Sequence, residues 1–127
     1  MAEKVNWTFA TRVLNGPTLA RSGELPVEAY VKIAVTIPQG QTVDVEVFPG
    51  GGGSAQLLVI DPGSPSDQLT YKVGSTDVKL DGPHVLIGSG AVGMLAGSSG
   101  TIGTLKFKNQ TAADAELSIL AGRDATP

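Results

Sequence analysis

The stretch YVKIAVTIPQGQTVDVEVF, residues 30–48, carries the clearest structural signal in the chain. Up to Ile37, apolar residues alternate with mostly polar ones, and the alternation resumes after a Pro-Gln-Gly turn. A period of two residues predicts β-strands that bury one face. We expect these two strands to be antiparallel neighbours, with Lys32 opposite Asp44 or Glu46.

Outward from this stretch, similar short apolar runs alternate with turns rich in Gly, Pro and Asp. The runs lie at residues 7–14, 56–60, 69–73, 78–80, 85–87 and 104–108. Strands at intervals of about 8–12 residues, without long amphipathic helices between them, predict an all-β fold. We expect one antiparallel β-sandwich domain over residues 1–127, jelly-roll or Ig-like, with about eight or nine short strands and little or no helix. Within it, residues 1–25 are a candidate for a partly extended N-terminal arm.

Two segments leave their local structure open. Residues 111–122 begin with the spacing of a helix cap, but Leu117 and Ile119 alternate with polar residues as in a strand. We favour the strand, paired as a hairpin with residues 104–108. Residues 88–103 are rich in glycine, which is typical of a bulged strand or of close backbone packing.

Composition and charge narrow the classes of partner. The chain has nine basic and twelve acidic side chains, and its formal net charge of −3 provides no field that would attract a nucleic acid or an anionic membrane. We expect no signal peptide, because no run has the required pattern, and no run approaches the roughly 20 apolar residues of a membrane span. The absence of cysteine excludes disulfides and thiolate chemistry but leaves the compartment open.

No motif predicts catalysis or a bound cofactor. Residues 88–93 match the Gly-x-Gly-x-x-Gly pattern of dinucleotide sites, but further glycines interrupt the helix that such a site needs. His84 is the only histidine, so a zinc site would lack further nitrogen or sulfur ligands. Asp44 and Glu46 have a spacing that suits paired-carboxylate chemistry, but a solvated strand face explains them as well. We therefore expect a protein that is not an enzyme.

Aspartates in the turns are the candidate ligands for a hard cation such as calcium. They are Asp61, Asp67, Asp77 and Asp81. No EF-hand spacing is present, and aspartate is an ordinary turn residue because its side chain bonds the local backbone. We expect no metal site, and calcium remains the secondary alternative.

Two apolar runs suggest a surface that needs a cover. Residues 57–60 and 85–87 are apolar at every position, although a sandwich strand buries only one face against the opposite sheet. The second face is covered either by another subunit or by the N-terminal arm, and the sequence does not distinguish the two. The first alternative predicts a homo-oligomer with Leu58, Ile60 and Leu86 in the subunit interface.

These observations favour a non-catalytic structural protein that self-associates as a coat, decoration or appendage subunit. The alternative is a β-sandwich module that binds a carbohydrate or another small ligand. Its candidate surface contains Tyr30 and Phe48, beside the glycine-rich loop at residues 49–54. Ordered assembly would support the first function, and stabilisation by a ligand would support the second.

Overall fold

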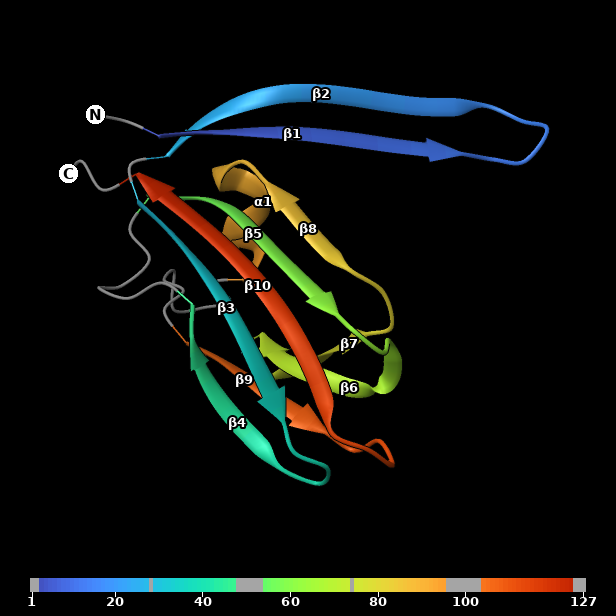
Figure 1. Ribbon diagram of the computed structural model, residues 1–127, viewed down its shortest axis with the longest axis vertical. Helices are drawn as coiled ribbons and strands as arrows, with labels where there is room; N and C mark the ends of the chain where they lie inside the picture. Colours follow the sequence, from blue (N-terminus) through green and yellow to red (C-terminus); the bar gives the residue numbers. More distant parts are fainter. Residues whose placement is uncertain (1–2, 28, 48–53, 74, 96–103, 125–127) are drawn as a thin grey trace.

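The computed structural model describes residues 3–27, 29–47, 54–73, 75–95 and 104–124 (Figure 1). These residues form antiparallel β-strands and one short helix. The strands are β1 (Glu3–Arg12), β2 (Thr18–Val27), β3 (Ala29–Ile37), β4 (Thr42–Glu46), β5 (Ser54–Pro62), β6 (Ser66–Val73), β7 (Thr76–Leu80), β8 (His84–Ile87), β9 (Thr104–Asn109) and β10 (Ala115–Asp124), and the helix is α1 (Ser89–Gly93). The predicted all-β antiparallel class is confirmed. The described residues form one strand more than the eight or nine expected, because the N-terminal segment forms two strands, β1 and β2, instead of one.

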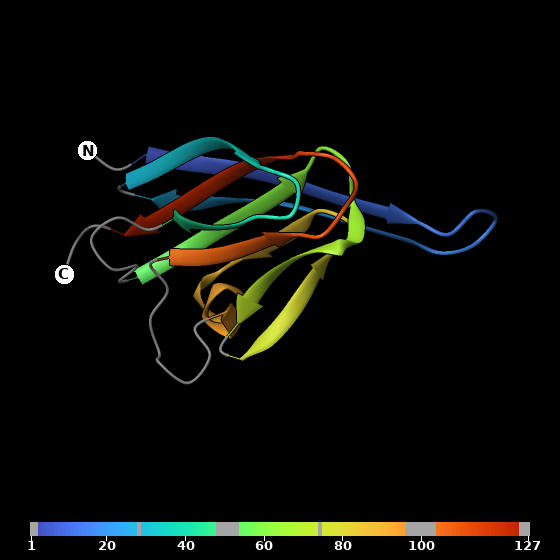
Figure 2. The ribbon, with the colours of Figure 1, turned by 90° about the horizontal axis from the view of Figure 1, so that it is seen from below.

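The strands form two four-stranded sheets and a separate hairpin. The strand order is β3-β10-β5-β8 in the first sheet and β4-β9-β6-β7 in the second. The pairs β3–β10, β4–β9, β5–β8 and β6–β7 are nested in the sequence. The chain from β3 to β10 therefore folds like one long hairpin wrapped into two layers, and Figure 2 shows β9, β6 and β7 below β3 and β10.

The core lies between the two four-stranded sheets. Its largest fully buried side chains come from both sheets and include Ile37, Leu58, Ile60, Leu117, Ile119, Leu69, Tyr71, Leu80 and Phe107. In β9 and in β10 up to Ile119, every second residue is buried, which is the period that predicted them as strands. The segment at residues 111–122 is thus a strand from Ala115 onward, as favoured.

Two of the expected strand pairings are wrong. β3 and β4 belong to different sheets, and Asp44 lies 3.5 Å from Lys106 Nζ rather than opposite Lys32. β9 and β10 also belong to different sheets, so they do not form the expected hairpin. In both cases the loop between the two strands leads from one four-stranded sheet to the other. The residue alternation predicts which face is buried, but it contains no information on which strand lies alongside.

The expected bulged strand at residues 88–103 is wrong where the structure describes it. Ser89–Gly93 form α1, and residues 96–103 lie outside the described residues. Gly88 has a φ of 95°, in the left-handed region that favours glycine, and its N–H donates to the carbonyl of Gln56 at 2.7 Å. This turn leads the chain from β8 into α1, where Val92 enters the core.

β1 and β2 form a hairpin, here called the arm, that projects beyond the two sheets in both views (Figures 1 and 2). Its turn is closed by the Val13 N–H, which donates to the Pro17 carbonyl at 3.0 Å. At its base, Val27 packs against Gly122 of β10, where an added Cβ would lie 3.0 Å from Val27 Cγ1. The arm is therefore attached to the first sheet through a contact that depends on the small size of glycine.

We expect Gly122→Ala to destabilise the protein by about 1–2 kcal/mol, because the new methyl group overpacks the contact with Val27. Urea unfolding measures this loss, and hydrogen exchange should become faster at the amides of β2. Gly90→Ala is the matched control, since a Cβ at Gly90 meets nothing within 4 Å. Equal stability of the two variants would contradict the proposed packing at the arm base.

Candidate functional site

The three predicted interface residues point into the core of the chain itself. Leu58 and Ile60 have no exposed surface, and Leu86 is half-buried and packs against the same core. Leu58 and Ile60 therefore offer no surface to a second subunit in this structure, and Leu86 lies on the same inward side of its strand. The physical reason is that side chains alternate between the two faces of a strand. The residues next to Leu58, Ile60 and Leu86 in the sequence therefore face away from the opposite sheet.

An apolar patch does lie on the outer face of the first sheet. Strand register places Leu120, Val59 and Val85 side by side, and directly opposite residues of paired strands share a face. We define the outer patch by these three residues together with Tyr30 and Ile87 at the two ends of the adjacent row, where the buried Gly122 and Leu57 lie between them. Lys32 continues the first row beside Leu120. Val85 is 49% exposed and Tyr30 is 61% exposed. The second face of the apolar runs is thus covered in part by the chain itself: at the arm base Val27 packs over Gly122, and Leu57 beside it is buried, whereas Val85 stays exposed.

The arm has an apolar face of its own. One side of the hairpin carries Thr11, Arg21, which lies directly opposite Phe9, and the buried Val27. On that same side the register of β1 and β2 places five further apolar side chains: Val5, Trp7, Phe9, Leu19 and Leu25. Near the base they are half-buried, whereas farther out Phe9 is 41% exposed and Leu19 is 65% exposed. The turn adds two more exposed apolar residues, Val13 and Leu14. This set, called the apolar arm face, was not singled out from the sequence, although residues 5–9 do alternate.

The opposite side of the arm is polar. Lys4 and Glu24 form an ion pair of 3.6 Å there, and both side chains are mostly exposed. The direct neighbours Ala10 and Ala20 lie on this same side. An isolated two-stranded hairpin is at best marginally stable in water, so an amphipathic one that extends beyond its sheets lacks the cover that would stabilise it. The arm therefore exposes apolar side chains toward its tip that the described part of the chain leaves uncovered.

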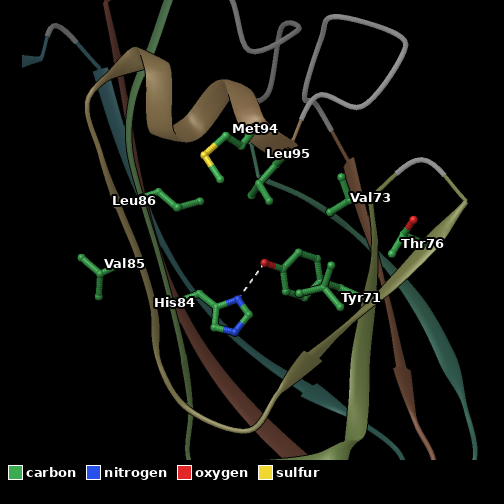
Figure 3. Close-up of a pocket in the computed structure, with 9 residues that line it drawn as sticks. Tyr71, Val73, Thr76, His84, Val85, Leu86, Met94 and Leu95 are labelled. Carbon is green, nitrogen blue, oxygen red and sulfur yellow. Dashed lines mark hydrogen bonds between the residues drawn. The ribbon is translucent and has the colours of Figure 1, made fainter.

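A second feature is a cavity of about 520 Å³ between the two sheets, beside β7, β8 and α1 (Figure 3). His84, at the start of β8, lies beside the buried Tyr71 of β6 at the edge of the cavity, and His84 Nδ1 is 2.7 Å from Tyr71 Oη. The two rings meet edge to face with centroids 5.5 Å apart. Burial raises the pKa of Tyr71 to about 12, so its hydroxyl stays protonated at neutral pH. His84 is thus a strand-start residue, as expected, but it also has a specific partner that the sequence did not indicate.

The other candidate residues do not form a site. Asp44 is engaged with Lys106, Glu46 is exposed, and Phe48 lies outside the described residues. Within the described ranges no group of three or more His, Cys, Asp or Glu side chains could hold a metal ion, so the turn aspartates do not converge. The Gly-x-Gly-x-x-Gly segment follows the antiparallel edge strand β8 and opens a helix of only five residues, which differs from a dinucleotide site.

Comparison with protein families, curated proteins and solved structures found no match to this chain. None of the helices in the described part of the chain has the length and apolar character needed to cross a membrane. The functional argument therefore depends on the arm, the outer patch and the cavity.

Proposed function

We propose that this chain is a non-catalytic, self-associating subunit of an ordered assembly, such as a coat, a decoration layer or an appendage. The arm of one copy packs with its apolar face on the outer patch of a second copy. The observation that carries the proposal is the apolar arm face, which continues beyond the sheets with Phe9 and Leu19 exposed. Covering these side chains would stabilise an otherwise marginal hairpin.

A second copy is the partner that fits best, because one chain contains both complementary surfaces. The outer patch is apolar and exposed at Val85 and Tyr30, as the arm is at Phe9 and Leu19. Charge also favours this pairing: residues 1–27 hold three basic and two acidic side chains, whereas residues 28–127 hold six basic and ten acidic ones. A slightly basic arm is therefore attracted to the acidic body of its neighbour.

The nested strand pairs are compatible with this proposal but do not by themselves favour it. We infer that β3 to β10 form a jelly roll, the eight-stranded double wrap that is found in viral capsid proteins and also in lectins. Because a fold does not define a function, this inference is consistent with both the assembly proposal and the carbohydrate-binding alternative. The arm, and not the wrap, favours assembly.

Phe9→Ser combined with Leu19→Ser is expected to weaken self-association roughly a hundredfold, because it removes two large apolar side chains from the buried interface. Light scattering coupled to size exclusion measures the effect: we expect multimers of the unaltered protein at micromolar concentration, and one chain for the variant. The control is Ala10→Ser with Ala20→Ser, which changes the polar side of the same two strands. A monomeric unaltered protein, or loss of association in both variants, would refute the proposal.

A further inference from the structure

We propose that the cavity between β6, β7, β8 and α1 is a binding site for a small, uncharged and mostly apolar molecule that carries one hydroxyl or carbonyl group. The residues that line this site differ from those of the arm and of the outer patch, except for Val85, which lies at its rim. Binding at this site does not depend on self-association.

The residues that line the cavity determine that most of the ligand must be apolar. Six aliphatic or thioether residues line it: Val73, Val78, Val85, Leu86, Met94 and Leu95. Figure 3 shows Met94 and Leu95 reaching over the cavity from the end of α1, opposite Tyr71 and His84. Its volume of about 520 Å³ lies within the range of roughly 300–1,000 Å³ that is usual for small-molecule sites.

The same lining excludes a charged ligand. No Asp, Glu, Lys or Arg is among the described residues that line the cavity. A carboxylate or an ammonium group that entered would lose its hydration without gaining an opposite charge from these residues. Neutral molecules therefore bind best, and Met94, which is 72% exposed, provides a flexible apolar side chain at the rim.

The Tyr71 and His84 pair provides the polar contact. When the Tyr71 hydroxyl donates to His84 Nδ1, the hydroxyl oxygen can still accept a hydrogen bond from a ligand hydroxyl. When Nδ1 carries the proton and donates to Tyr71 Oη, the Tyr71 hydroxyl is free to donate to a ligand carbonyl. Because the Tyr71 hydroxyl is protonated at neutral pH and can both donate and accept, one fixed oxygen can recognise either group.

Naphthol, naphthalene and naphthoate test this site, because they share a ring system and differ in the polar group. Amide chemical shifts in β6, β8 and α1 report their binding. We expect naphthalene to bind about fivefold more weakly than naphthol, the usual effect of one neutral hydrogen bond, and naphthoate to bind most weakly. In Tyr71→Phe the preference for naphthol over naphthalene should disappear, while naphthalene affinity stays unchanged.

Leu95→Trp is the second variant, because the larger ring occupies the cavity and should abolish the binding of all three probes. The proposal is overturned if naphthol leaves these amides unshifted, if its preference survives in Tyr71→Phe, or if naphthoate binds most tightly. Light scattering on Tyr71→Phe should show unchanged self-association, so failure of this site and failure of the assembly proposal are distinguishable.

Discussion

Mixing two variants that are each monomeric is expected to restore a dimer. The first is the arm variant, Phe9→Ser with Leu19→Ser, which retains an intact outer patch. The second is Val85→Glu, which places a charge in the outer patch and retains an intact arm. The proposed contact joins the arm of one chain to the outer patch of another. In the mixture Val85→Glu supplies an intact arm, and the arm variant supplies an intact outer patch. Light scattering should then give a mass of two chains, and of one chain for either variant alone.

This mixing experiment separates three modes of association. If two arms met symmetrically, Val85→Glu alone would still form a dimer, and if two patches met symmetrically, the arm variant alone would still form one. Only an arm-to-patch contact leaves both variants monomeric and restores a dimer on mixing. Ala34→Glu is the control for the added charge, since Ala34 is exposed on the same face of the sheet but outside the outer patch. It should associate like the unaltered protein. A mixture that stays monomeric would contradict the arm-to-patch contact.

The fold class could be predicted from the sequence because it depends on local signals. The alternation that ends at Ile37 predicts the strand that became β3, and the Asp-Pro-Gly turn after Ile60 ends β5 close to where it was expected. Strand pairing could not be predicted in the same way. Asp44 pairs with Lys106, which lies far away in the sequence, and no local pattern of apolar residues encodes such a contact.

The candidate site shows the same division between local and long-range information. Residues 57–60 and 85–87 predicted an apolar face that needs a cover, and the arm base covers part of it, but the residues assigned to a subunit interface were the inward ones. A run that is apolar at every position does not show which alternate residues face the core. An assignment that is wrong by one residue therefore exchanges Leu58 for Val59. The contact between Tyr71 and His84 joins the two sheets, and only the assembled fold brings these side chains together.

Asn109→Ala is expected to have the largest effect on stability of any single substitution on a polar residue described here. Asn109 has no exposed surface, and its Nδ2 donates to the carbonyls of Ile37 at 2.9 Å and Ala113 at 2.8 Å. Its Oδ1 accepts from the N–H of Thr111 at 2.9 Å. These bonds join the end of β3, the end of β9 and the loop before β10, which is where the chain crosses between the two sheets.

Removing this side chain leaves the Ile37 carbonyl buried without its side-chain partner and removes the hydrogen bonds of Asn109 to Ala113 and Thr111. The loop keeps the bond from the Gln39 N–H to Asp114 Oδ1 and that from the Gln110 N–H to the Gln68 carbonyl. We expect a loss of about 3 kcal/mol in the free energy of unfolding, measured by urea denaturation, because an unsatisfied buried polar group costs about 1–3 kcal/mol and other hydrogen bonds are lost with it. The control is Gln110→Ala, an exposed neighbour whose backbone N–H alone is engaged, with the Gln68 carbonyl. It should change stability by less than about 0.5 kcal/mol. Equal stability of the two variants would mean that Asn109 does not hold the crossing of the sheets together.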